Sequence, residues 1–112
     1  MKKEAGGNYI NGAVRILSGQ YQDTILKLQP GEKLVVGRDV NTCHLVLEAP
    51  WISRYHCTIS FDFEKKEYIV VDYSGNGTFI KDGKRLIKEI PQCFESGTVI
   101  TIGENGIALQ LM

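Results

Sequence analysis

Charge of one sign is not in excess in this sequence of 112 residues, because 13 lysine and arginine residues balance 13 aspartate and glutamate residues. Proteins that bind duplex DNA or anionic membranes usually carry a surplus of basic residues, which supplies much of their affinity. We therefore expect no nucleic acid and no direct membrane contact among the partners. Net charge does not report on a small basic pocket.

Long hydrophobic runs are also missing, and cysteines are few. No apolar run approaches the ~20 residues that cross a bilayer. The first residues, MKKEAGGNYINGAV, are charged and glycine-rich and lack the apolar centre of a signal peptide. The three cysteines are an odd number, which does not favour a disulfide framework, and reduced thiols are usual in the cytoplasm. We expect a cytoplasmic protein or the cytoplasmic domain of a larger protein.

The length predicts a single domain that is large enough to bury a core without disulfides or metals. Hydrophobic residues make up 43% and charged residues 23% of the chain, which is typical of a soluble globular domain. We expect a flexible N-terminal lead over residues 1–12 and one domain over residues 13–112. This domain can be part of a larger multidomain protein.

Apolar residues recur in many short runs with a period of two, and no stretch has the period of an amphipathic helix. The dipeptides Asp82-Gly83 and Asn105-Gly106 separate pairs of such runs and are strong hairpin signals. The pattern predicts an all-β protein, an antiparallel sandwich or barrel, with no substantial helix. The expected strands lie at residues 13–17, 24–28, 33–37, 44–47, 56–61, 67–72, 78–80, 85–87, 98–102 and 107–112.

Three segments between these runs are polar and irregular: residues 38–43, 48–55 and 73–77. In a β-sandwich such loops commonly carry the function. Arg38 opens the first segment and offers a planar fork of donors that suits a carboxylate or a phosphate. The third segment contains SGNGT, whose small residues expose successive backbone amides that can bind an anion.

Three short motifs follow one another in these segments: Gly37-Arg38, then Ser-x-x-His formed by Ser53 and His56, then Asn76-Gly77-Thr78. In this order and at these intervals they resemble the forkhead-associated (FHA) domain. The resemblance begins near residue 13 and extends through the runs NGTFIKDGKRL and GTVITIG. It implies an antiparallel two-sheet β-sandwich of about eleven strands. It also implies loops that bind phosphothreonine in partner proteins, for kinase-dependent signalling or assembly.

The resemblance also implies a role for individual residues. The phosphate-binding residues would be Arg38 and Ser53, with help from Arg54 and from the backbone of Gly75. The peptide main chain would be bound by Asn76. Structural roles would belong to Gly37, His56, Gly77 and Thr78.

One position departs from the family pattern. Gly75 stands where family members often carry serine or threonine, so the side chain brings no hydroxyl to a phosphate. This departure supports an alternative function, a structural docking domain of the same fold that binds partners independently of phosphate.

Enzyme and metal functions are the remaining alternatives. The spacing of Ser53 and His56 is compatible with a nucleophile and its base, but a hydrolase also needs an orienting third group and an oxyanion hole. The sequence has no Gly-x-Ser-x-Gly elbow. The pairs Cys43-His44 and His56-Cys57 cannot easily share one metal, because adjacent strand residues point to opposite faces. We expect no catalytic activity, no metal and no cofactor, and we expect Cys57 to pack in the core.

Overall fold

The computed structural model describes residues 12–112, so the expected lead falls outside the described residues except for its last position. Ten strands are present in this part of the chain, and it contains no helix. Accordingly, residues 12–112 offer no helix that is long and apolar enough to cross a membrane. The strands are β1 (Ala13–Ile16), β2 (Ile25–Lys27), β3 (Leu34–Gly37), β4 (Leu45–Val46), β5 (Cys57–Asp62), β6 (Glu67–Asp72), β7 (Thr78–Ile80), β8 (Gln92–Phe94), β9 (Val99–Ile102) and β10 (Ile107–Leu111).

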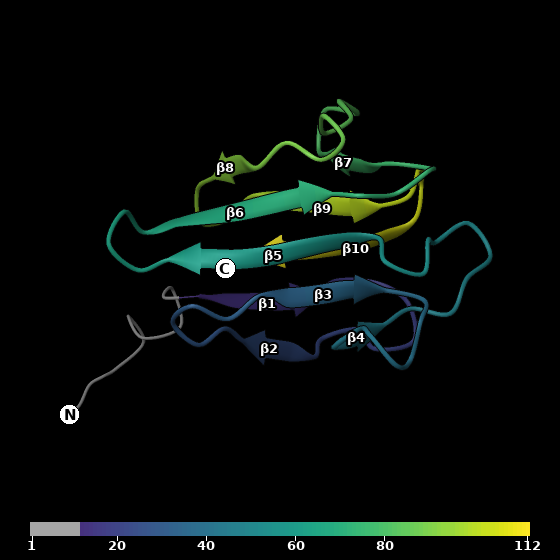
Figure 1. Ribbon diagram of the computed structural model, residues 1–112, viewed down its shortest axis with the longest axis horizontal. Coiled ribbons are helices and arrows are strands. Elements are labelled where there is room, and N and C mark those ends of the chain that lie inside the picture. Colours follow the sequence, from purple (N-terminus) through teal and green to yellow (C-terminus); the bar gives the residue numbers. More distant parts are fainter. Residues whose placement is uncertain (1–11) are drawn as a thin grey trace.

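The strands form two five-stranded sheets that pack against each other as a β-sandwich (Figure 1). The strand order is β2-β1-β10-β9-β7 in one sheet and β4-β3-β5-β6-β8 in the other. The expected all-β sandwich without substantial helix is therefore confirmed. Residues 12–112 form ten strands, close to the expected number of about eleven.

Three details differ from the sequence-based expectation. The run at residues 85–87 forms only an isolated bridge, between Arg85 and Phe79, and no strand. Strand β8 arises from Gln92–Phe94, which has no clear apolar alternation. Strands β3 and β4 pair in parallel, although the other strand pairs are antiparallel. The segment between them turns back across the end of β3, and the two residues of β4 then run beside β3 in the same direction.

The core lies between the two sheets and is formed by alternate residues of the central strands. In β5, Cys57 and Ile59 are completely buried and Phe61 is 5% exposed, which confirms the expected core position of Cys57. Burying a side chain of this size contributes about 1.5–3 kcal/mol. Both sheets contribute the other fully buried apolar side chains, which are Val14, Val36, Tyr68, Val70, Ile100, Ile102, Leu109 and Leu111.

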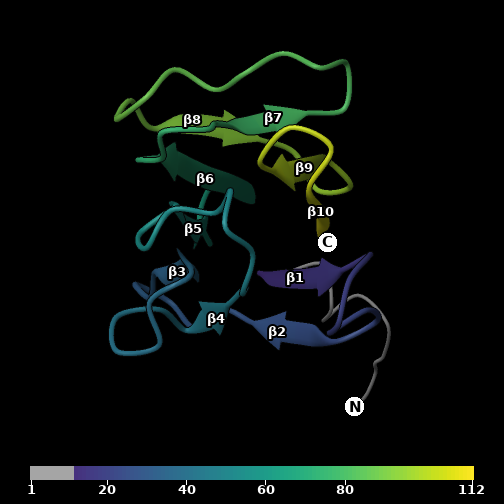
Figure 2. The same cartoon turned by 90° about the vertical axis from the view of Figure 1, so that its right-hand side faces the viewer.

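The strand pairing brings three distant segments to one end of the sandwich. Strand β5 is antiparallel to both β3 and β6, and the register aligns Val36, Cys57 and Asp72. The end of β3, the start of β5 and the end of β6 therefore lie side by side. We call residues 38–43 the first loop, residues 48–55 the second loop and residues 73–77 the third loop. All three lie at the right-hand end in Figure 1, and Figure 2 looks onto that end.

Candidate functional site

The first loop is bonded to the second loop through Arg38. The backbone N–H of Arg38 is shared between the carbonyl oxygens of Ser53 at 3.0 Å and Arg54 at 3.1 Å. Its side-chain Nε donates to the carbonyl oxygen of Ile52 at 2.9 Å. Both the backbone and the inner part of the guanidinium are thereby fixed against the second loop, which leaves the two terminal nitrogens to point outward.

Gly37 makes this close approach of the two loops sterically possible. A Cβ atom at this position would lie 2.2 Å from the carbonyl oxygen of Arg54 and 2.8 Å from Sγ of Cys43. The first of these is backbone, which cannot move aside without displacing the second loop. The requirement at Gly37 is therefore space for the neighbouring chain, and it does not depend on an unusual φ angle.

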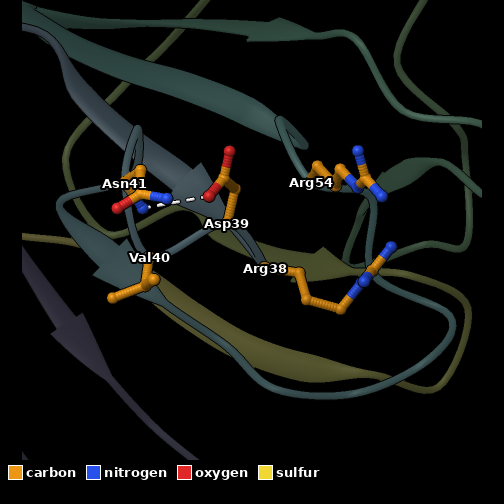
Figure 3. A pocket seen from close by; sticks show the side chains of 5 residues that line it. All are labelled: Arg38, Asp39, Val40, Asn41 and Arg54. Atoms are coloured by element: carbon orange, nitrogen blue, oxygen red, sulfur yellow. Dashed lines mark hydrogen bonds between the residues drawn. The ribbon is translucent and has the colours of Figure 1, made fainter.

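Two guanidinium groups meet in a depression at the loop end. A cavity of about 410 Å³ is lined by Arg38, Asp39, Val40, Asn41 and Arg54. The side chains of Arg38 and Arg54 extend in the same direction from neighbouring loops (Figure 3). Within residues 12–112, neither the terminal nitrogens of Arg38 nor the guanidinium of Arg54 has a hydrogen bond or an ion pair. Two adjacent unpaired cations on exposed loops are the arrangement that attracts an anion.

His56 supports the loops from below. It is completely buried and lies immediately before β5. Its Nδ1 accepts a hydrogen bond from the N–H of Ser53 at 3.0 Å, so Nε2 carries the proton and donates to the carbonyl oxygen of Gly77 at 2.9 Å. Burial lowers the pKa of His56 below its ordinary value because desolvation disfavours the charged ring. The neutral ring thus joins the second loop to the third and has no free nitrogen for acid–base chemistry.

The third loop is organised by Asp72, the last residue of β6. Its Oδ1 accepts hydrogen bonds from the N–H of Ser74 at 3.1 Å, from the hydroxyl of Ser74 at 2.6 Å and from the hydroxyl of Thr78 at 2.9 Å. Oγ of Ser74 in turn accepts from the N–H of Gly77 at 2.7 Å. All four residues are buried, so this network fixes the turn from inside the protein.

The outer part of the third loop contacts the second loop. The N–H of Gly75 donates to Oγ of Ser53 at 3.2 Å, and Nδ2 of Asn76 donates to the carbonyl oxygen of Trp51 at 2.8 Å. The backbone N–H of Asn76 has no partner within residues 12–112. The Ser53 hydroxyl and the amides of Gly75 and Asn76 are therefore held together where the second and third loops meet.

The geometry brings together the candidate residues of all three motifs, but they do not share one hollow. Arg38 and Arg54 line the cavity, whereas Ser53, Gly75 and Asn76 lie on the adjoining loop surface. Sequence reasoning missed Asp72 and Ser74, although an aspartate two residues before a serine at a strand end is a known turn signal. It also missed the free backbone amide of Asn76, which no sequence signal reveals.

The two cysteine–histidine pairs have other partners. Sγ of Cys43 donates to the carbonyl oxygen of Arg54 at 3.0 Å, and Nδ1 of His44 accepts from the N–H of Val35 at 2.9 Å. Cys57 lies in the core, where burial raises the pKa of its thiol. Across residues 12–112, no three His, Cys, Asp or Glu side chains lie close enough together to hold a metal ion.

Comparison with known proteins gives consistent results for fold and family. The chain is 37% identical over 92 residues to the Caenorhabditis elegans protein germ layers disorganized gldi-3, and this match covers 74% of the chain and 10% of that protein. The chain thus spans about a tenth of that curated relative. The crystal structure of the MEK1 FHA domain superposes with a TM-score of 0.76 at 25% identity, covering 90% of this chain and 88% of that one.

A second solved structure is the N-terminal FHA domain of Saccharomyces cerevisiae Rad53p in complex with a phosphothreonine peptide. It matches with a TM-score of 0.69 at 24% identity and covers 87% of both chains. The family model for the FHA domain matches residues 34–103, which include all three loops and more than half of the chain. The chain therefore belongs to the FHA domain family.

Proposed function

We propose that this domain binds phosphothreonine in partner proteins through the three loops at one end of the sandwich. The observation that carries the proposal is the pair of unpaired guanidinium groups of Arg38 and Arg54 that line one cavity at the loop end. The Rad53p FHA domain, which has the same fold, was solved with a phosphothreonine peptide bound.

Simple electrostatics supports a phosphate ligand at these loops. A phosphothreonine carries about −1.5 to −2 charges at neutral pH and three acceptor oxygens. Each charge-assisted hydrogen bond contributes roughly 1.5–3 kcal/mol, so three or four contribute roughly 5–12 kcal/mol before the costs of association and ordering. At the upper end of this range, subtracting an association cost of about 4 kcal/mol leaves about −8 kcal/mol, which corresponds to a micromolar affinity. Such an affinity suits reversible, kinase-dependent signalling or assembly.

Each candidate residue has a distinct part in this proposal. The terminal nitrogens of Arg38 and the guanidinium of Arg54 neutralise the phosphate. The hydroxyl of Ser53 and the N–H of Gly75, which are bonded to each other in the free domain, exchange this bond for bonds to phosphate oxygens. The side-chain amide of Asn76 leaves the carbonyl oxygen of Trp51 and binds the peptide main chain.

The domain itself transforms no substrate under this proposal and needs no cofactor or metal. Because the chain spans about a tenth of its curated relative, we propose that it is one binding module of a larger protein. Its partners are then phosphorylated proteins of the cytoplasm, without nucleic acid or direct membrane contact.

The function is tested by titrating a phosphothreonine peptide library into the purified domain, with each peptide also present in its unphosphorylated form. We expect micromolar binding by a subset of phosphorylated peptides and at least about 30-fold weaker binding by their unphosphorylated partners, which lack the charge-assisted hydrogen bonds. Equal binding of both forms would reject the proposal and favour phosphate-independent docking.

Gly75→Ser is expected to raise the affinity for a phosphothreonine peptide by about threefold to tenfold, because it adds a hydroxyl donor beside the phosphate. A Cβ atom at Gly75 would meet no heavy atom within 4 Å, so the serine fits without displacing the loop. The affinity is measured by isothermal titration calorimetry. Gly75→Ala is the matched control and should bind as the natural domain does; an equal gain in both variants would contradict the role of the hydroxyl.

A further inference from the structure

We propose that Arg85, which lies outside the three motifs, is a positioning residue of the site and aims two backbone amides of the third loop at the bound phosphate. The inference rests on the proposed function for its ligand. Its structural basis is a set of contacts between Arg85 and the third loop, and these can be tested in the free domain.

Arg85 lies beside the third loop because of the hairpin that follows β7. The N–H of Leu86 donates to the carbonyl oxygen of Thr78 at 2.8 Å, and the N–H of Ile80 donates to the carbonyl oxygen of Lys84 at 2.9 Å. These bonds hold the returning strand against β7, with an isolated bridge at Arg85. The side chain is thereby directed along β7 toward the third loop.

The guanidinium of Arg85 binds two successive carbonyl groups of the third loop. Its Nη2 donates to the carbonyl oxygens of Ser74 and Gly75, each at 3.2 Å. In a trans peptide unit, the carbonyl oxygen and the N–H of the next residue point in opposite directions. By holding both carbonyls on its own side, Arg85 directs the N–H groups of Gly75 and Asn76 to the opposite side.

The two amides that are turned in this way are the exposed donors of the candidate site. The N–H of Gly75 points at Oγ of Ser53, and the N–H of Asn76 has no partner within residues 12–112. Successive N–H groups that face the same side form an anion-binding concavity. Arg85 thus acts on the phosphate through the third loop, whereas Arg38 and Arg54 act through their own charge.

A buried carboxylate keeps the guanidinium in place. Oδ2 of Asp72 is fully buried and has no hydrogen-bond partner within the described residues, and Nη2 of Arg85 lies 3.9 Å away. This separation is too long for a hydrogen bond but close enough for attraction, which solvent weakens because the Arg85 side chain is 43% exposed. Gly77 leaves the necessary room, because a Cβ atom there would lie 2.9 Å from Nε of Arg85. Asp72 therefore helps to orient the guanidinium that binds the two loop carbonyls.

The test compares Arg85→Met, Arg85→Lys and the control Lys84→Met, which removes the same charge from a neighbouring exposed position of the hairpin. Binding of a phosphothreonine peptide is measured by calorimetry, and folding is checked by thermal unfolding. We expect about tenfold weaker binding for Arg85→Met, partial rescue to about threefold for Arg85→Lys, and a change below about twofold for Lys84→Met.

A ligand-free measurement separates positioning from the loss of charge. In ¹H–¹⁵N spectra of Arg85→Met, we expect the amide signals of Gly75 and Asn76 to move more than those of Arg38 and Ser53. Lys84→Met should leave all four in place. Binding by Arg85→Met within about twofold of the natural domain, or an equal loss in Lys84→Met, overturns the inference.

Two further outcomes remain decisive. If Arg85→Met does not fold, the comparison of Arg85→Lys with Lys84→Met decides, and equal affinities overturn the inference. If the natural domain binds no phosphorylated peptide, the proposed function is wrong, and the amide signals alone decide whether Arg85 orients the loop. Unmoved signals of Gly75 and Asn76 then reject the positioning role as well.

Discussion

Arg38→Ala is expected to weaken binding of a phosphothreonine peptide by about 30-fold or more, while the domain stays folded. The terminal nitrogens of Arg38 are the donors that the second loop leaves unused, and the substitution removes them together with a positive charge. Calorimetry with a phosphorylated peptide gives the loss, and circular dichroism reports the fold. The backbone bonds of residue 38 to Ser53 and Arg54 are retained by alanine, so the loop end should keep its shape.

Lys65→Ala is the control for the loss of charge. Lys65 is exposed in the turn between β5 and β6, at the end of the sandwich opposite the three loops (Figure 1). The same charge is removed there without touching the site, and surface charges at this distance are largely screened by salt. We expect less than a twofold change, about the size of the measurement error. Equal losses in Arg38→Ala and Lys65→Ala would reduce the role of Arg38 to its contribution to net charge.

Gly37→Ala is expected to destabilise the domain by about 3 kcal/mol or more, because its Cβ would have to displace a neighbouring backbone segment. The Cβ would lie 2.2 Å from the carbonyl oxygen of Arg54, which also accepts hydrogen bonds from the N–H groups of Arg38 and Asp39. Separating the first loop from the second therefore breaks several hydrogen bonds at once. Urea unfolding, followed by tryptophan fluorescence of Trp51, gives the free energy of unfolding.

Gly75→Ala serves as the matched control for this prediction. A Cβ atom at Gly75 meets nothing within 4 Å, and Gly75 is not among the residues with positive φ. The free energy of unfolding should therefore change by less than about 0.5 kcal/mol, as for ordinary surface substitutions. A Gly37→Ala domain as stable as Gly75→Ala would show that the first and second loops do not approach as closely as described.

The arrangement of the core could be predicted because it follows from local alternation. The inward set of β5, with Cys57 and Ile59, follows from a period of two, and Asn105 has the positive φ that its hairpin signal predicts. The short strand β8 could not be predicted, because Gln92–Phe94 becomes a strand only through its pairing with β6. Likewise, no local signal indicates that β3 and β4 pair in parallel.

The candidate site could be predicted only in part, because the contacts that orient its residues are not local in sequence. The resemblance of three ordered motifs to the FHA domain named Arg38, Ser53 and Asn76, and antiparallel pairing of β5 with β3 and β6 places their loops at one end of the sandwich. The contacts that orient these residues cross long intervals of sequence. The bonds from Arg85 to the third loop depend on the hairpin after β7, and the role of Asp72 depends on complete burial. Neither condition can be read from the residues alone.

The most direct measurement of the central claim is a ¹H–¹⁵N titration of the domain with a phosphothreonine peptide and with its unphosphorylated form. The account predicts that the phosphorylated peptide shifts the backbone amide signals of Ser53, Gly75 and Asn76 and the Nε–H signal of Arg38, and that the unphosphorylated peptide leaves them in place. Shifts confined to other surfaces, or equal shifts with both peptides, would contradict it.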